Sequence, residues 1–257
     1  MNDLNTCEEG TALNCLTQAA RAHDATLADS LCLRIEGITQ RILAAARSSE
    51  DAAKHTQILA VSKTVCAERL REAYACGQRA FGESYVQEAR VKQDALSDLA
   101  IEWHFIGPVQ ANKTRLIAEH FDWVHSVDRL RVAERLSSQR PAELPALNVC
   151  LQVNIDREPS KSGALPEDLP VLARHIAQLP HLRLRGLMAI PRPTHDVAAQ
   201  NDSFRRVRLL LENLRHEGLA LDTLSMGMSD DLESAVAQGA TWIRIGTAIF
   251  GTRPVPV

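Results

Sequence analysis

The stretch from residue 57 to residue 82, QILAVSKTVCAERLREAYACGQRAFG, decides the fold. A short apolar run from Gln57 to Ser62 leads through a loop into a helical pattern from Ala67 to Ala75, and a second apolar run follows from Arg79 to Gly82. Short apolar runs are typical of buried strands, and the residues between them have the spacing of an amphipathic helix. The stretch therefore predicts one strand-helix-strand unit, in which the two strands run parallel.

The same unit repeats along the rest of the chain. Further strands are expected over Glu102 to Ile106, Trp123 to Ser126, Ala146 to Asn154, Leu184 to Met188, Thr223 to Met226 and Thr241 to Ile245. Helical patterns alternate with them over Tyr85 to Leu96, Lys113 to His120, Leu130 to Ser138, Leu169 to Leu179, Asp202 to His216 and Leu232 to Gln238. Eight strands that alternate with helices predict an α/β fold, a single closed (β/α)8 barrel of the TIM type. A doubly wound open sheet is the alternative, but it usually has fewer strands, and no Gly-rich nucleotide fingerprint follows the first strand.

The barrel is expected to form one domain over residues 27–257. It begins with an amphipathic lead-in helix, whose apolar residues recur at helical spacing from Leu27 onward. Residues 1–26 are polar and aperiodic, and they form an N-terminal extension that could be flexible. No Pro, Gly or Ser-rich linker divides the repeat, so a second domain is not visible.

Composition excludes several classes of function. The chain is 45% hydrophobic and 24% charged, with a formal net charge of −3. This balance lacks the clustered Lys and Arg that nucleic acids or anionic membranes require. The start of the chain has no secretion signal and no later run could span a bilayer, so the cytoplasm is the expected location. We also expect the protein to be a monomer.

The six cysteines predict neither a disulfide framework nor a metal site. They are Cys7, Cys15, Cys32, Cys66, Cys76 and Cys150, and no two of them form a Cys-x-x-Cys pair. Without that pattern, or a histidine at zinc-finger spacing, we interpret them as buried or incidental thiols and assign no metal ligand.

Ligand sites in barrels of this type lie at the carboxyl ends of the strands. Lys63 directly follows the first strand. A lysine held among apolar neighbours loses its charge more easily than in water, and a neutral amine attacks an aldehyde to form a Schiff base. A lysine after a strand is usually a solvated loop residue, however, so position alone favours that role for Lys63.

The last two strands end in small residues that could hold a phosphate through hydroxyl and backbone N–H groups. They are Ser225, Gly227 and Ser229 in one loop and Gly246 and Thr247 in the next. The alternative is that Ser229 caps the following helix and that the acids at 230, 231 and 233 complement the helix dipole. Those acids also count against a bound anion, unless they point away from it.

Arg244 precedes the last of these loops. Its usual role would be that of an ion-pair partner at the barrel end. If a pyridine ring spanned the distance from Lys63 to the phosphate loops, Arg244 could donate to the ring nitrogen. Arginine keeps its proton, so the ring nitrogen would stay unprotonated and the ring would be a weaker electron sink.

Other candidates are weaker, and no residue is assigned a catalytic role. His104 lies inside a predicted strand and is expected to be a core histidine. Lys161 follows the fifth strand and is the second choice for a reactive amine. Three arginines, at 205, 206 and 208, are expected to form a solvated helical face.

Seven motifs, in the order found in the family, resemble the pyridoxal phosphate homeostasis proteins. They are ILAVSKT (58–64), AFGESYVQE (80–88), WHFIGPVQANK (103–113), SKSG (160–163), GLMAIP (186–191), SMGMSDD (225–231) and RIGTAIFG (244–251). The resemblance runs from about residue 30 to residue 253. One position departs from it, because Ser84 stands where the family usually has Asn.

This resemblance implies a single-domain barrel of the alanine racemase N-terminal type that holds pyridoxal 5′-phosphate (PLP) as an internal aldimine. By motif, Lys63 is the aldimine lysine and Arg244 meets the pyridine nitrogen. The Ser225 to Ser229 loop, with Gly246 and Thr247, holds the phosphate. The implied role is intracellular PLP (vitamin B6) homeostasis without established catalytic turnover, with PLP-requiring apo-enzymes as candidate recipients.

A PLP-dependent amino acid racemase is the alternative function. Racemisation needs an acid-base group on each face of the substrate carbanion. The resemblance implies that racemases of this type add a second domain, which supplies a tyrosine to the partner subunit. This sequence ends at Val257 and contains only Tyr74 and Tyr85, so the binding role is favoured.

Overall fold

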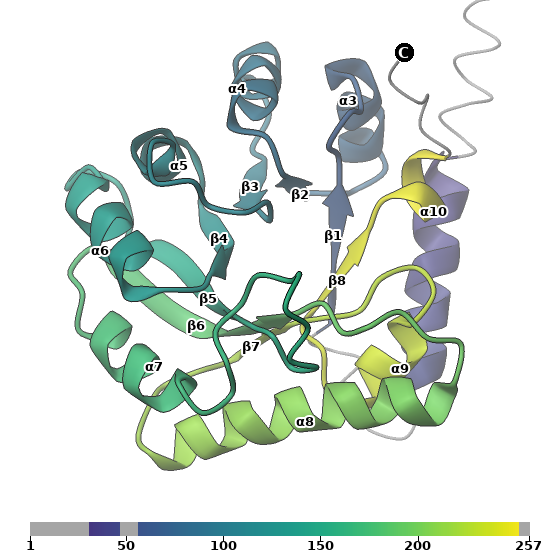
Figure 1. The fold of residues 1–257 in the computed structure, drawn as a ribbon. Helices are drawn as coiled ribbons and strands as arrows, with labels where there is room; N and C mark the ends of the chain where they lie inside the picture. The colour runs from purple at the N-terminus through teal and green to yellow at the C-terminus, as the bar shows by residue number, and fades with distance from the viewer. Residues whose placement is uncertain (1–30, 47–55, 252–257) are drawn as a thin grey trace, which may run out of the picture.

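The computed structural model describes residues 31–46 and 56–251. Within them, eight parallel strands close into a barrel in which each strand pairs with the next and β8 pairs with β1 (Figure 1). The strands are β1 (Gln57–Val61), β2 (Ala80–Glu83), β3 (Glu102–Phe105), β4 (Trp123–Val127), β5 (Leu147–Val153), β6 (Leu182–Ala189), β7 (Thr223–Ser225) and β8 (Trp242–Ile245). The predicted (β/α)8 barrel is confirmed, and the open sheet is excluded.

Helices cover the outside of this barrel. They are α3 (Ala67–Ala75), α4 (Val86–Ala95), α5 (Thr114–His120), α6 (Leu130–Gln139), α7 (Leu169–Ala177), α8 (Val197–His216), α9 (Leu232–Ala237) and α10 (Thr247–Phe250). A further helix over 31–45 precedes β1 and is the purple ribbon beside α9 and α10 in Figure 1. It confirms the lead-in helix from Leu31 onward, whereas residues 1–30 lie outside the described residues.

Two helices differ from expectation at the strand-to-helix junctions. The long helix α8 begins at Val197 rather than at Asp202, because the side chain of Asp196 caps it by accepting from the N–H of Ala198 at 2.9 Å. Its first residue, Val197, is 63% exposed, so apolar periodicity gave no sign of this turn. The short helix α10 was not predicted at all.

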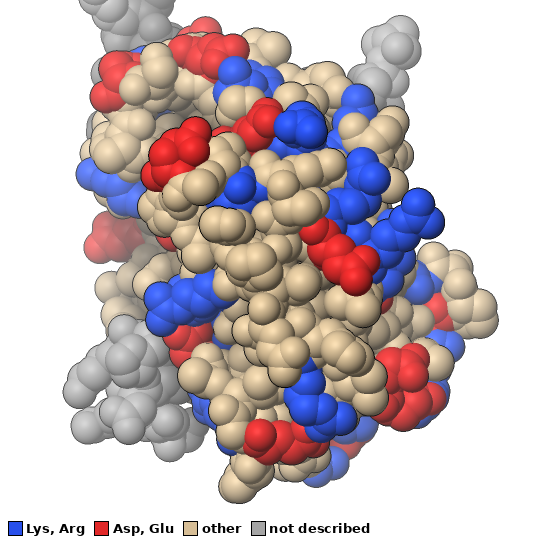
Figure 2. Space-filling view, turned by 90° about the vertical axis from the view of Figure 1, so that its left-hand side faces the viewer, with Lys and Arg blue, Asp and Glu red and all other residues tan. Residues whose placement is uncertain are grey.

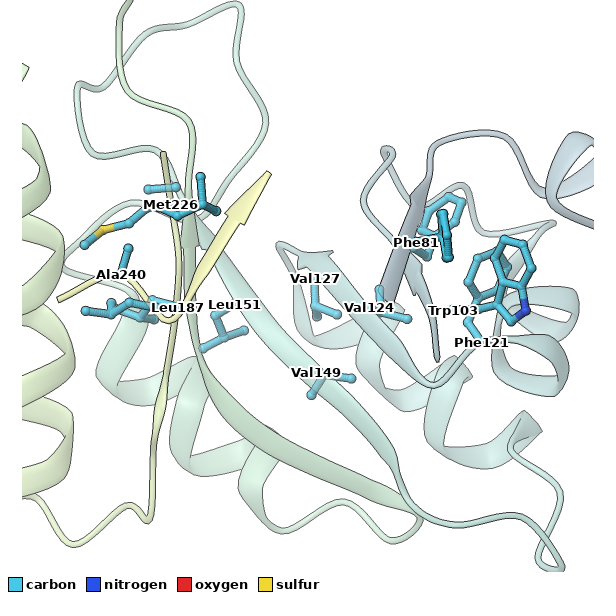
Figure 3. Packing of buried hydrophobic residues seen from close by; sticks show 14 of the residues in the cluster. Phe81, Trp103, Phe121, Val124, Val127, Val149, Leu151, Leu187, Met226 and Ala240 are labelled. Atoms are coloured by element: carbon cyan, nitrogen blue, oxygen red, sulfur yellow. The ribbon is translucent and has the colours of Figure 1, made fainter. Parts of the chain in front are cut away.

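The hydrophobic core lies mainly between the strands and the helices. Figure 3 shows this layer, in which side chains such as Leu151, Leu187 and Met226 pack in one continuous cluster. Alternate side chains of each strand point into the barrel instead. Two smaller apolar clusters, separate from the main one, pack there: Leu59, Ala80 and Trp242 in one, and Trp123, Cys150 and Met188 in the other. The remaining interior positions include polar residues.

The pairing of β1 with β8 determines which strand ends meet. Leu59 lies opposite Arg244, and Ala60 lies opposite Ile245. Because the two strands are parallel and in this register, the loop that carries Lys63 emerges beside the loop that follows Arg244. Residues about 180 positions apart in the chain are therefore neighbours at the barrel mouth.

A disulfide between Cys32 and Cys76 corrects the expectation that all cysteines are thiols. Cys76 ends α3, where Gly77 takes the left-handed conformation (φ +94°) that commonly terminates a helix. Cys32 lies in helix 31–45, and the two residues are 44 positions apart, so their spacing gave no sign of pairing. Cys66 is an exposed thiol and Cys150 a buried one, and burial raises the pKa of Cys150. Cys7 and Cys15 lie outside the described residues.

The surface carries charges of both signs. Figure 2 shows the side that lies to the left in Figure 1, where Lys and Arg alternate with Asp and Glu. Several of the molecule's surface charges form ion pairs, such as Arg174 with Glu217 and Arg90 with Asp94. This face therefore has no extended basic stripe of the kind that polyanions bind. In the described part of the chain, no helix is both long and apolar enough to cross a bilayer.

The disulfide yields a stability prediction. Cys76→Ser should lower the free energy of unfolding by about 2–4 kcal/mol, because the unfolded chain regains the entropy that the closed loop had removed. Urea unfolding under oxidising conditions measures the change. Cys66→Ser is the control and should stay within about 0.5 kcal/mol of wild type. Equal stability of Cys76→Ser and wild type would contradict the prediction.

Candidate functional site

A cavity of about 720 Å³ opens at the carboxyl ends of the strands. Its lining includes residues from the loops after β1, β2, β3, β6, β7 and β8, as well as one residue from helix 31–45. Five predicted site residues line it together: Lys63, Ser229, Arg244, Gly246 and Thr247. An amine, a guanidinium and small donors thus line one cavity.

The other two predicted residues, Ser225 and Gly227, are not among the lining residues and are buried. The hydroxyl oxygen of Ser225 accepts a hydrogen bond from Arg244 Nη1 at 3.0 Å. Gly227 has a φ of +93°, and an added Cβ would lie 2.5 Å from the Cβ of Ala235. Both residues therefore support the wall, and Gly227 permits a close approach of the loop to α9 that a side chain would prevent.

Arg244 is fixed rigidly in this wall. Its Nη1 also donates to the carbonyl of Ser225 at 2.7 Å, and its Nη2 donates to the carbonyl of Ala189 at 2.9 Å. Burial lowers the pKa of Arg244 to about 10, which is still far above neutrality. The guanidinium is therefore a permanent cation, held in one plane by carbonyls from β6 and β7.

Two of the three acids after the seventh strand are engaged elsewhere. Asp231 accepts from the N–H of Met228 at 2.6 Å, and burial raises its pKa. Glu233 pairs with Arg41 at 2.7 Å, whereas Asp230 lines the cavity. The N-cap of α9 is Asp231, so the alternative role of Ser229 as the helix cap is wrong.

Arg41 is a site residue that sequence reasoning missed. It lies in helix 31–45, lines the cavity and donates from Nη2 to the carbonyl of Ser229 at 2.9 Å. In the sequence it is one charged residue on an amphipathic helix, and only the packing of that helix beside α9 brings it to the mouth. It places a guanidinium group, which is paired with Glu233, next to the small-residue loops.

The backbone that carries Lys63 is held in an unusual conformation. Thr64 has a φ of +63°, a costly value for a β-branched residue. The N–H of Thr64 donates to Glu88, and Lys92 Nζ donates to the carbonyl of Ser62 at 2.7 Å. These two contacts from α4 hold the residues on both sides of Lys63, so the loop cannot relax to an ordinary turn.

Lys92 also neutralises a buried carboxylate beneath this loop. Its Nζ lies 2.8 Å from Oε1 of Glu83, whose side chain is fully buried. Burial raises the pKa of Glu83, and Lys92 lowers it, with further help from the hydroxyl of Ser62 at 2.6 Å. The sequence placed Lys92 in a helical pattern and gave no sign of this role.

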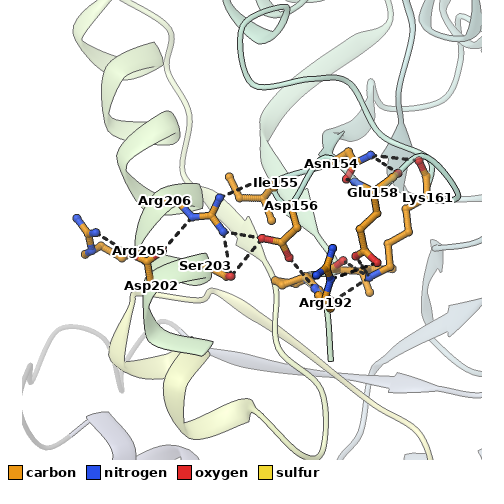
Figure 4. A network of polar contacts seen from close by, with 12 residues as sticks. Asn154, Ile155, Asp156, Glu158, Lys161, Arg192, Asp202, Ser203, Arg205 and Arg206 are labelled. Carbon is orange, nitrogen blue, oxygen red and sulfur yellow. Dashed lines mark hydrogen bonds and ion pairs between the residues drawn. The ribbon is translucent and has the colours of Figure 1, made fainter. Parts of the chain in front are cut away.

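Lys161, the second candidate amine, lines a neighbouring cavity of about 250 Å³. Its Nζ lies 2.6 Å from Glu158 and donates to the carbonyl of Pro191 at 3.1 Å (Figure 4). This is the setting of a structural ammonium group that ties its loop to the end of β6. Figure 4 also corrects the view of Arg206 as merely solvated, because it donates to the carbonyl of Ile155 at 2.9 Å.

Ser84, the departure from the family pattern, lies in the wall of the main cavity. Its hydroxyl is shorter than the usual asparagine amide. The cavity wall that follows β2 thus presents one hydroxyl group at this position.

The closed barrel places the chain in the class of proteins built on the alanine racemase N-terminal domain. The sequence model described as "Alanine racemase, N-terminal domain" matches residues 39–254. An alanine racemase of Clostridium difficile aligns with a TM-score of 0.71 at 11% identity, over 88% of this chain and 58% of that chain, which shows the shared fold.

Within that class, the chain belongs to the pyridoxal phosphate homeostasis protein family. It is 62% identical over 219 residues to the pyridoxal phosphate homeostasis protein of Pseudomonas aeruginosa, which is 85% of this chain and 94% of the relative. A solved structure of PipY from Synechococcus elongatus with PLP bound is 43% identical, covers 83% of this chain and 100% of its own, and has a TM-score of 0.72.

The buried pair of Glu83 and Lys92 yields a prediction. Lys92→Met should cost about 3–5 kcal/mol of unfolding free energy, because it leaves a buried carboxylate without a positively charged partner. The double variant Lys92→Met/Glu83→Gln should recover part of that loss, and Lys113→Met at the start of α5 is the control. Equilibrium unfolding of wild type, Lys92→Met, Glu83→Gln and the double variant measures the cycle, with Lys113→Met measured alongside.

The stability of Lys92→Met should decrease as the pH rises. In Lys92→Met the folded-state pKa of Glu83 rises further above its unfolded value. The stability of this variant is then retained below the unfolded pKa and lost as the pH rises through the folded one. A double variant no more stable than Lys92→Met at neutral pH would contradict the assignment.

Proposed function

We propose that this chain binds PLP in the mouth cavity, through a Schiff base to Lys63, and serves cytoplasmic PLP homeostasis without catalytic turnover. The observation that carries the proposal is the single cavity lined by Lys63, Arg244 and the loops with Ser229, Gly246 and Thr247. Family membership and the PLP-bound PipY structure support the choice of cofactor.

The residues present suit each part of the cofactor. An amine can condense with the aldehyde, so that a C=N bond forms and water leaves. Arg244 is a fixed donor for the ring nitrogen, and Arg41 adds positive charge near Ser229 and Thr247 for the phosphate. PLP supplies an aldehyde carbon and a ring that can accept electrons; the chain supplies orientation and charge.

Two features favour holding the cofactor over using it. A permanent cation at the ring nitrogen keeps that nitrogen unprotonated, which weakens the ring as an electron sink. Racemisation would need a second acid-base group, and neither tyrosine lines the cavity: Tyr85 is 59% exposed, and Tyr74 lies in α3 under the guanidinium of Arg79. Stored cofactor would then pass to PLP-requiring apo-enzymes.

The first test identifies the lysine. PLP added to the protein should produce a visible absorbance band, and borohydride followed by peptide mass spectrometry should find the cofactor on Lys63. Lys63→Ala should lose the band, while Lys161→Ala keeps it. Cofactor fixed only to Lys161 in the wild-type protein would overturn the assignment.

The second test separates the carrier from the racemase. Holoprotein incubated with L-alanine in deuterated water should show negligible exchange at Cα by NMR, because neither of the two tyrosines lines the cavity. Transfer of PLP to an apo-enzyme should proceed in the same preparation. Sustained exchange that disappears in Lys63→Ala would establish the racemase instead.

Arg41 provides a third test. Arg41→Gln should weaken PLP binding about tenfold, since it removes one charge-assisted contact, and should change binding of pyridoxal, which lacks the phosphate, much less. Arg34→Gln is the matched control, because Arg34 lies on the same helix but donates to Ile249 outside the cavity. Equal losses for PLP and pyridoxal would show that Arg41 acts only by holding the loop.

A further inference from the structure

A chain of polar side chains crosses the barrel interior beneath the cavity. Arg244 Nη1 lies 3.0 Å from Ser225 Oγ, which lies 2.7 Å from Nδ1 of His125. Nε2 of His125 lies 2.8 Å from Nδ1 of His104, and Nε2 of His104 lies 3.3 Å from Oε2 of Glu102. Five side chains from four strands thus connect the cavity wall with the amino-terminal end of β3.

The middle of this chain is sealed from solvent. The side chains of His104, His125 and Ser225 are fully buried, whereas Glu102 at the far end is 42% exposed. The ring of His104 stacks on Trp123 with an interplanar angle of 7°. Burial in the described interior leaves these polar groups dependent on one another for hydrogen bonds, so their proton positions must agree.

Glu102 determines those positions, starting from the far end. Its Oε1 accepts from the indole N–H of Trp123 at 2.6 Å, and its contacts with His104, the largest effect, keep its pKa low. A carboxylate repels a lone pair, so the nitrogen of His104 that faces it must carry a proton. This contact lies outside hydrogen-bond geometry and acts electrostatically.

The proton on Nε2 of His104 determines where the protons of His125 and Ser225 lie. Burial lowers the pKa of His104 and brings that of His125 well below its usual value, so both rings are neutral at pH 7. A neutral His104 with a proton on Nε2 has a bare Nδ1, which accepts from Nε2–H of His125. Nδ1 of His125 is then also bare and accepts from the hydroxyl of Ser225. The oxygen of Ser225 keeps its lone pairs for Arg244.

We propose that His104 and His125 are positioning residues, which pass the orientation set by Glu102 to the hydroxyl of Ser225 and thereby orient Arg244, the proposed donor for the ring nitrogen of the cofactor. The part that concerns the cofactor rests on the proposed function. The two histidines do not touch the cavity themselves. They act through Ser225, at the opposite end of the barrel from the solvent-exposed carboxylate.

The first test reads the proton positions directly in the cofactor-free protein. Two-bond ¹H–¹⁵N NMR of ¹⁵N-histidine protein should show both rings neutral at pH 7, with protonated Nε2 and bare Nδ1. Assignment uses His104→Gln and His125→Gln spectra. A proton on Nδ1 of either ring, or a charged His104, overturns the inference, whatever the variants below do.

Glu102→Gln should reverse the direction of the hydrogen bonds along the side chains from His104 to Ser225. The indole N–H of Trp123 continues to donate to the side-chain carbonyl oxygen at position 102. The amide NH₂ then faces His104, so Nε2 of His104 must become the acceptor. Both rings should then carry the proton on Nδ1, and Ser225 would receive two donors. Glu143→Gln, which removes the charge of an exposed loop residue, is the matched control and should leave both tautomers unchanged.

PLP titration of the same proteins measures the consequence at the site. Glu102→Gln should weaken PLP binding about 3- to 10-fold, the effect of misdirecting one buried hydrogen bond, with Glu143→Gln unchanged. Reversed tautomers with unchanged affinity would overturn the positioning role. If wild-type protein binds no PLP, the proposed function fails while the NMR result still decides the proton order.

Discussion

Backbone pairing between β8 and β1, with Leu59 opposite Arg244, is the contact on which the rest of the molecule depends. It converts a row of parallel strands into a closed barrel and removes both sheet edges. The same register places the loop of Lys63 beside the loops after β7 and β8. Closure therefore creates the cavity and selects the residues that face one another across it.

The barrel buries side chains in two regions, one between the strands and the helices and one inside the ring of strands. Between strands and helices the packing is apolar and continuous, as bulk burial of hydrophobic surface favours. Inside the barrel, polar side chains lie beside two small apolar clusters. Burying such groups is costly unless they are hydrogen-bonded, so a linked set such as His125, Ser225 and Arg244 fixes one arrangement and tolerates few others.

The mouth is braced by elements outside the strand repeat. Helix 31–45 contacts the loop after β7 through Arg41 and is joined to the end of α3 by the disulfide at Cys32. From α4, Lys92 and Glu88 hold the strained backbone around Lys63. These braces therefore hold both the backbone around Lys63 and the loop after β7 in place.

Sequence alone determined the barrel, because strand and helix periodicities are local properties that each segment carries by itself. It also determined that Lys63 and Arg244 lie at the mouth, since strand ends in a parallel barrel share one face. The tertiary structure alone decided the positions of Arg41, Lys92 and the Cys32–Cys76 bond. It also showed that Ser225 lies behind the residues that line the cavity, where its hydroxyl contacts Arg244. Those contacts join residues as many as 192 positions apart, as Arg41 and Glu233 are, and no local pattern encodes a contact that only packing creates.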